Sequence, residues 1–335
     1  MERLPDDSWW QDALAIYKAQ ADNLHADRIP RVKGDGLTVG DLRGRFLTAK
    51  SRALDAGEIT IRTYAEYRST ANLLLATFSE NRLVDDLAAD DFEALRDDLA
   101  KRFGPVRLGN EVQKVRTVFK YGFETGLIYK PIRYGPQFKK PSASVLRRHR
   151  AKNGERMLEV NELRQLLVAL EGNRILTGRM DENTGQPETV KLAANPVLKA
   201  MILLGVNCGF IGKDCTDLPL ASVDLKNGWI NFPRPKTGIP RRCPLWKETV
   251  EALKAAIAER PEPKHKAAEK LVFVTTRGQP WITRGTANPV SVNVRDLMKT
   301  LGIHRDGLGF ATLRHVFRTV ADGVRDQVAV NHIMG

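Results

Sequence analysis

The sequence is poor in cysteine, and the spacing of its cysteines excludes the common cysteine-based sites. Cys208, Cys215 and Cys243 are the three cysteines in 335 residues, and they form no Cys-x-x-Cys pair. An odd number leaves one thiol outside any disulfide scheme, which favours a reducing compartment and argues against a zinc ribbon. The six histidines show no His-Glu-x-x-His or other metal-binding spacing. We therefore expect no metal and no cofactor.

Long hydrophobic runs are also missing. The longest apolar stretch, at 197–206, is interrupted by Lys199 and is far shorter than the ~20 residues that span a bilayer. Residues 1–20 contain acids and two tryptophans where a signal peptide needs a basic start and an apolar run. The sequence thus predicts a soluble, cytoplasmic protein with no membrane partner.

Acidic residues are outnumbered by basic ones. The chain has 53 Lys and Arg against 40 Asp and Glu, a formal net charge of +13. Such an excess favours a polyanionic partner, nucleic acid first and an anionic membrane surface second. A basic but merely soluble surface is the alternative on charge alone.

Apolar residues at helical spacing predict four short amphipathic helices up to about residue 130. The first begins after Thr38 and the second after Thr60, each a plausible N-cap, and the third begins at Asp90 with Glu93 as its capping-box partner. The positions expected to face the core are Val39, Leu42, Phe46, Leu47, Ile61, Tyr64, Ala71, Leu75, Phe78, Phe92, Leu95, Leu99, Leu108, Val112, Val115, Phe119 and Phe123. Together they indicate a small all-α domain.

Residues 130–156 are strongly basic and carry no periodic apolar pattern. Three prolines punctuate the segment, and nine basic residues stand against one acid, Glu155. The basic residues are Lys130, Arg133, Lys139, Lys140, Arg147, Arg148, Arg150, Lys152 and Arg156. We expect an extended interdomain linker that lies on phosphates, with a solvated tether as the alternative.

The second half mixes helices with a β-hairpin. Trp229, Ile230 and Phe232 precede a Pro-Lys-Thr-Gly turn, and a return strand runs to Leu245. Helices are expected from Glu159, at 196–206, 247–259, 288–301, 309–322 and 326–334, with a short strand at 271–275 and a loose polar loop at 172–192.

Two basic positions in this half can act on a phosphate. Lys236 lies at the hairpin tip, from which a lysine can touch a phosphate or donate a proton to a leaving oxygen. Arg314 lies on the helix GFATLRHVFRTVADGV, next to His315 and four residues before Arg318. A guanidinium on a rigid helix suits bidentate phosphate recognition. Taken singly, a solvated turn lysine or an exposed arginine pair is the alternative.

In their order along the chain, these parts resemble the tyrosine recombinase (phage integrase) family. LPLASVDLKNGWINFPRPKTGIPRRCPLW is similar to the family's strand-hairpin block, ATLRHVFRTVAD to its second catalytic box, and AVNHIMG to the start of its third. GEITIRTYAEYRSTANLLLATFSENRLVDDL resembles its core-binding domain, so the resemblance covers about 35–335. It implies a mainly α fold with a small β-hairpin or sheet, in which a helical core-binding (SAM-like) domain precedes an α+β integrase-type catalytic domain.

The resemblance also implies roles. In the family a tyrosine attacks the DNA phosphodiester, two arginines stabilise the phosphorane and a hairpin lysine is the general acid, without ATP or metal. Lys236 matches that lysine, Arg314 the second arginine, and His315 the histidine that follows it. Ile211 stands where the family has its first arginine, with Lys213 two residues on, and Ala311 replaces a histidine. All six tyrosines, at 17, 64, 67, 121, 129 and 134, precede residue 135, so we expect this chain not to cleave DNA by itself.

Three functions stay open. The chain is an incomplete or degenerate integrase-type enzyme, a non-catalytic DNA-binding relic or regulator at recombination sites, or a basic RNA-binding or scaffold protein. The expected domains are a possible arm-site remnant (1–34), the core-binding domain (35–129), a basic linker (130–158) and a catalytic domain truncated at its C-terminus (159–335). Double-stranded DNA is the expected partner, bound by a possible homo-oligomer on paired sites. The expected phosphate contacts are Arg62, Arg68, Lys114, Arg116, Lys120, Arg147, Arg148 and Arg150.

Overall fold

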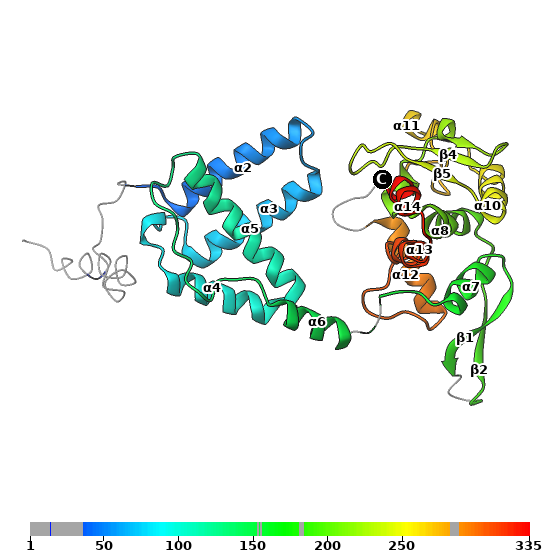
Figure 1. The fold of residues 1–335 in the computed structure, drawn as a ribbon, viewed down its shortest axis with the longest axis horizontal. Coiled ribbons are helices and arrows are strands. Elements are labelled where there is room, and N and C mark those ends of the chain that lie inside the picture. Colours follow the sequence, from blue (N-terminus) through cyan, green and yellow to red (C-terminus); the bar gives the residue numbers. More distant parts are fainter. Residues whose placement is uncertain (1–13, 15–35, 153, 155, 181–183, 282–287) are drawn as a thin grey trace, which may run out of the picture. The chain divides into compact units, whose positions relative to one another are not determined.

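The computed structural model divides the chain into two compact units, Met1–Lys152 and Asn153–Gly335. It describes residues 14, 36–152, 154, 156–180, 184–281 and 288–335. Apart from Leu14, the possible arm-site remnant at 1–34 lies outside these residues. Figure 1 labels the helices and strands of each unit.

The described elements of unit 1 are helices. Its elements are α2 (Val39–Asp55), α3 (Ile61–Phe78), the 3-10 turn η1 (Val84–Asp86), α4 (Ala89–Arg102), α5 (Pro105–Glu124) and α6 (Ala143–Lys152). Helix α5 packs against α2, α3 and α4. The predicted four-helix domain is therefore present as α2 to α5.

Two of the three predicted helix starts are confirmed. Thr38 Oγ1 accepts a hydrogen bond from Asp41 N at 3.0 Å, and the Asp41 carboxylate accepts one from Thr38 N. Thr60 Oγ1 accepts from Thr63 N at 3.2 Å. The third prediction is wrong: α4 begins at Ala89, and the Asp91 carboxylate accepts from Ala88 N at 2.8 Å.

Aromatic rings fill the core of unit 1. The rings of Phe92 and Phe119 meet edge to face at 5.4 Å between centroids, and Phe46 meets Tyr67 in the same way. Two predicted core residues are exposed, Ile61 at 75% and Phe123 at 44%. They lie in the first and last turns of their helices, where the helix extends beyond the core.

The segment after α5 is neither extended nor outside the core. Phe138 is fully buried, and its ring stacks on Tyr134 at 5.7 Å. Residues 143–152 form α6, so the prediction of an extended linker is wrong there. Leu, Ala and Arg are strong helix formers, and no Pro or Gly interrupts residues 142–152.

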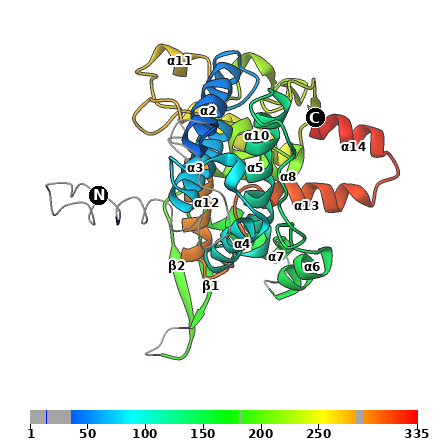
Figure 2. The same ribbon diagram turned by 90° about the vertical axis from the view of Figure 1, so that its left-hand side faces the viewer.

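Unit 2 combines helices with two small antiparallel sheets. Its elements are α7 (Val160–Ala169), β1 (Arg174–Met180), β2 (Pro187–Lys191), α8 (Pro196–Cys208), α9 (Gly212–Thr216), η2 (Leu220–Ser222), β3 (Val223–Asp224), β4 (Trp229–Asn231), β5 (Arg242–Pro244), α10 (Lys247–Ala258), α11 (Lys266–Glu269), α12 (Pro289–Thr300), α13 (Thr312–Asp322) and α14 (Gln327–Met334). Helix α8 is buried on nearly every side and packs on α10 and α13. Helix α14 folds back beside α13 (Figure 2).

The hairpin prediction is confirmed and two others in unit 2 are wrong. Strand β4 pairs with β5 in the register Ile230↔Cys243, and β3 completes a three-stranded sheet. The loop expected at 172–192 contains the β1–β2 hairpin, in which Ile175 pairs with Val190. β-branched residues at such positions favour strands. The strand expected at 271–275 is reduced to one bridge between Pro219 and Leu271.

The predicted fold class, mainly helical with a small sheet, is confirmed. None of the described helices combines the length and the apolarity that a membrane crossing requires.

Candidate nucleic-acid interface

Arg314 on α13 is held by backbone carbonyls from two other elements. Its Nη1 donates to Gly209 O at 2.8 Å and its Nη2 to Met334 O at 2.9 Å. Gly209 ends α8 in the left-handed conformation, with φ +62°, and a Cβ there would lie 3.2 Å from Phe317. Glycine therefore lets α8 end close to α13, with its carbonyl directed at the guanidinium.

The turn between β4 and β5 brings a second arginine to the same place. Arg234 O accepts from Gly238 N at 2.8 Å, which closes the predicted Pro-Lys-Thr-Gly turn. Arg234 Nη1 donates to Gly335 O at 2.8 Å, so the turn lies against the end of α14. Lys236 is exposed, two residues further along this turn. The resemblance pairs Lys236 with Arg314, whereas the structure brings Arg234 beside Arg314.

A third arginine lies beneath, in a buried ion pair. Arg241 Nη1 lies 3.3 Å from Asp214 Oδ2, and both side chains are at most 1% exposed. Arg241 Nε donates to Phe232 O at 2.9 Å, and its guanidinium lies 4.1 Å from the centre of the Phe210 ring. We call Arg234, Arg241 and Arg314 the arginine cluster.

Ile211, where the resemblance expects an arginine, is the N-cap of α9. Its N–H donates to Asp214 Oδ2 at 2.9 Å, and its side chain carries no charge. Lys213 does not replace the arginine, because its Nζ pairs with Asp217 at 2.5 Å on the exposed side of α9. Neither residue adds a cation to the arginine cluster.

The cluster has more positive than negative charge, and this affects the pKa values of Arg314 and of the neighbouring Cys243. Burial, followed by the neighbouring charge of Arg234, lowers the pKa of Arg314. A hydrogen bond from Cys208, with the charges of Arg241 and Arg314, lowers the pKa of Cys243. The charge of Arg241 acts to lower the pKa of Cys208, Cys215 and Cys243, although burial raises the pKa of Cys208 and Cys215 overall.

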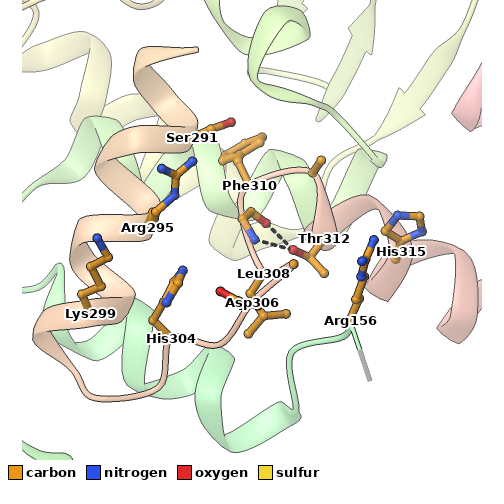
Figure 3. Close-up of a pocket in the computed structure, with 13 residues that line it drawn as sticks. Arg156, Ser291, Arg295, Lys299, His304, Asp306, Leu308, Phe310, Thr312 and His315 are labelled. Carbon is orange, nitrogen blue, oxygen red and sulfur yellow. Dashed lines mark hydrogen bonds between the residues drawn. The ribbon is translucent and has the colours of Figure 1, made fainter. Parts of the chain in front are cut away.

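A basic pocket of about 720 Å³ lies next to the first turn of α13 (Figure 3). Ser291, Arg295 and Lys299 line it from one face of α12, at spacings of four residues. Figure 3 shows His304 on the same side as Arg295 and Lys299, with Arg156 and His315 on the other side. Thirteen residues line this cavity, which we call the basic pocket. Asp306 is the acidic residue among them.

Sequence reasoning placed Arg156 in the linker and missed Arg295, Lys299 and His304 as site residues. The signal was the spacing of four along 288–301, which puts Arg295 and Lys299 on one polar helical face. Among the described residues, no group of three or more His, Cys, Asp or Glu side chains could hold a metal ion.

The phosphate contacts expected on unit 1 fall into two groups. Arg62, Arg68 and Lys120 are exposed, although Arg62 pairs with Glu66 at 3.2 Å and Lys120 with Glu124 at 3.5 Å. Exposed pairs of this kind are weak and leave both cations accessible. On α6, Arg147, Arg148 and Arg150 are exposed as well.

The side chains of Lys114 and Arg116 instead make ion pairs and hydrogen bonds within unit 1. Lys114 Nζ lies 3.1 Å from Glu111 and 3.4 Å from Glu66, and its side chain is 20% exposed. Arg116 Nη2 donates to Phe138 O at 2.5 Å, and its guanidinium lies over the Tyr134 ring. Its Nε is buried. These contacts fix residues 134–138 against α5.

Residues 187–335, all in unit 2, match the model of the phage integrase family. Over these residues the chain is similar to phage integrases. No protein of curated function matches the sequence. The matched region contains Lys236, Arg314 and His315, the three residues that the resemblance singled out.

Solved integrases have the same fold. A Tn1549 transposon integrase in complex with a circular intermediate DNA aligns with a TM-score of 0.67 and 14% identity, over 89% of this chain and 91% of that one. A lambda integrase dimer bound to a COC′ core site aligns at 0.62 and 16% identity, over 89% and 95%. A lambda integrase tetramer bound to a Holliday junction aligns at 0.61 and 16%, over 96% and 86%. At these identities the likeness establishes the shared fold.

Proposed function

We propose that the chain is a DNA-binding protein of the site-specific recombinase type, which holds duplex DNA through its phosphates. One observation carries the proposal: Arg314 and His315, consecutive on α13 in the region similar to phage integrases, belong to the arginine cluster and to the basic pocket, respectively. The two basic regions therefore meet at one point of α13. DNA presents a row of phosphates, so it is a ligand that can occupy both at once.

The resemblance implies phosphoryl transfer from DNA to a tyrosine hydroxyl, a reaction that residues 1–335 would support but not complete. Arg314 would stabilise the charge that develops on the nonbridging oxygens of the phosphate, because its guanidinium is already fixed by Gly209 O and Met334 O. Lys236 would protonate the leaving 5′-oxygen from the exposed turn, and His315 would support the phosphate. A phosphotyrosyl intermediate conserves the energy of the phosphodiester, so the reaction needs neither ATP nor a metal.

The tyrosine is the missing component within residues 1–335. No tyrosine follows Tyr134 within these residues, so residues 153–335 contain no nucleophile of the family's type. We propose that these residues bind and activate the DNA phosphate without cleaving it. A non-catalytic regulator at recombination sites remains the second candidate function, favoured by Ile211 at the position of the first arginine.

Unit 1 would provide a second set of contacts to the DNA phosphates. We propose residues 35–129 as a core-binding domain, 130–158 as a basic connection and 159–335 as the catalytic domain. Arg62, Arg68 and Lys120, with Arg147, Arg148 and Arg150 of α6, would contact phosphates as exposed cations. We propose further that the protein acts in the cytoplasm and that copies of it assemble on paired DNA sites.

The basic pocket gives the sharpest test. In R295Q/K299Q, the affinity for duplex DNA should fall and the slope of log K against log salt should flatten by up to about two units, since each lost phosphate contact removes roughly 0.9. The matched control is K247Q/K254Q, two exposed lysines of α10 outside the pocket. Equal effects of the two double variants on binding, or tighter binding to duplex RNA, would contradict the proposal.

A further inference from the structure

The arginine cluster holds three guanidinium groups close to a single carboxylate. Arg314 Nη2 and Arg234 Nη1 donate to the consecutive carbonyls of Met334 and Gly335, and Arg241 pairs with the carboxylate of Asp214. Three like charges at short range destabilise one another unless an anion joins them. An additional anion bound beside the three guanidinium groups would therefore stabilise the arginine cluster.

Some N–H donors of the arginine cluster have no acceptor within the protein. Arg241 Nη2 and Arg234 Nε are buried without a hydrogen-bond partner, and the Arg241 side chain is fully buried. A buried N–H without an acceptor is costly, and this is most severe for a charged group. Two such groups on one hairpin that lies close to Arg314 are consistent with a site for an acceptor.

The two hairpin arginines have different positions. Arg241 is locked by Asp214, by Phe232 O and by the ring of Phe210, and it lies under the turn. Arg234 is only partly buried, and one backbone carbonyl, Gly335 O, accepts from its Nη1. Arg234 can thus exchange this carbonyl for a ligand oxygen, whereas Arg241 cannot leave its partners without disrupting the hairpin.

We propose that Arg234 and Arg314 together bind one phosphate group, and that Arg241 is a positioning residue that holds Arg234 beside Arg314. Two guanidiniums match the two nonbridging oxygens of a phosphodiester, each through a planar pair of N–H donors. The inference rests on the proposed function, which makes this phosphate one of DNA. Arg234 would then supply from the hairpin the second guanidinium that Ile211 does not supply from α9.

Inorganic phosphate, titrated into the full chain, tests the site directly. The arginine Nε–H signals of Arg234 and Arg314 in ¹⁵N-labelled protein should shift together with a single Kd. R234Q should weaken phosphate binding on the order of tenfold or more, the effect of losing a charge-assisted pair of hydrogen bonds. R234K should recover only part of the affinity, because an ammonium lacks the planar fork.

The control lies on the same hairpin. Arg242 is exposed, and its guanidinium covers Trp229 at 4.2 Å, outside the cluster. R242Q should leave the phosphate Kd unchanged. An equal loss in R234Q and R242Q, or a wild-type Kd in R234Q, would overturn the inference.

The positioning role of Arg241 has its own readout. In R241Q the Arg234 Nε–H signal should move even without phosphate, and the phosphate Kd should rise. In R241K the signal position and the Kd should both return part of the way to their wild-type values. A lower melting temperature with an unchanged Kd would show that Arg241 is merely structural. If R241Q does not fold, the Arg234 and Arg242 variants still decide whether the site exists.

The outcome is separable from that of the proposed function. Phosphate binding that depends on Arg234, without any binding of duplex DNA, would keep the anion site and refute the DNA proposal. Duplex binding that is weakened by R295Q/K299Q, with phosphate binding indifferent to Arg234, would keep the DNA proposal and refute this one.

Discussion

Arg156 lies directly over Gly307: a Cβ built on Gly307 would be 2.7 Å from Arg156 Nε and 3.0 Å from its Cδ. Gly307 also has φ +89°, a conformation that residues with a side chain rarely adopt. The glycine therefore fixes both the loop before α13 and the place of Arg156 at the basic pocket.

Replacing this glycine should weaken DNA binding without removing a charge. In G307A the new methyl group displaces the Arg156 guanidinium, so the affinity for duplex DNA should fall severalfold while the salt slope changes by at most one unit. G126A is the matched control, because Gly126 has a similar φ of +72° and a Cβ there meets no atom within 4 Å. Filter binding of both variants, with thermal melts, measures the effect; equal affinities would show that Arg156 takes no part.

The exposed arginines of α6 should contribute additively to the salt dependence. In R147Q/R148Q/R150Q the slope of log K against log salt should flatten by up to about three units, at roughly 0.9 per contact. The matched control K226Q/K254Q/K270Q removes three exposed charges from unit 2. A slope that does not change in the α6 variant would remove α6 from the interface.

Limited proteolysis should separate the two units. Trypsin is expected to cut first between Arg147 and Arg156, near the division at 152–153, and to leave an α-helical fragment containing α2 to α5. Bound duplex DNA should slow this cut. First cuts within residues 60–125, detected by mass spectrometry, would contradict the division into units.

Residues 1–335 should form no covalent adduct with a nicked suicide DNA substrate. No tyrosine follows Tyr134 within these residues, and the resemblance aligns Ile211 and Ala311 with two cationic positions of the family. Each missing charge-stabilising donor costs on the order of 10²–10³ in rate. An adduct retained on a denaturing gel would mean that a tyrosine of unit 1 or another type of residue attacks the phosphate.

A chain extended beyond Gly335 with a histidine and a tyrosine tests whether the nucleophile is the component that residues 1–335 lack. We expect trace cleavage from the extended chain, and more when it also carries I211R. The same extension with phenylalanine in place of the tyrosine is the control. Equal cleavage with and without I211R would indicate that the arginine cluster already suffices.

The stability of unit 1 should depend on pH through Tyr134. Burial raises the pKa of Tyr134 to about 12, against an ordinary value of 10. The folded state therefore keeps this proton in a range where the unfolded chain has lost it, so the contribution is complete below pH 10 and is lost as the pH rises from 10 to 12. The difference in urea-unfolding free energy between the wild type and Y134F should shrink over this interval. A constant difference would contradict the burial of the hydroxyl.

Local signals predicted most of the helices. The hydroxyls of Thr38 and Thr60 mark the starts of α2 and α3, because a side-chain oxygen satisfies a backbone N–H that the first turn leaves free. The Pro-Lys-Thr-Gly turn likewise specifies its hairpin through Gly238, at φ +70°. These features depend on residues close in sequence, which is why the sequence alone reveals them.

The features that were missed depend on distant residues. Phe138 lies in a segment without periodicity and is buried because Phe92, on α4, packs against its ring. Arg241 finds Asp214 across 27 positions, and no spacing rule links the two. The motif located Arg314, but the identity of its neighbours depends on how the hairpin packs against α13.

The bonds that fix the arginine cluster also set when it can appear during synthesis. Arg314 reaches Gly209 across 105 positions, and Arg234 reaches Gly335 across 101. Unit 1 can fold while the ribosome is still translating unit 2, since domains fold from the N-terminus onward. A growing chain can therefore hold a folded helical unit while unit 2 is still being made, and it acquires the proposed anion site only when α14 emerges.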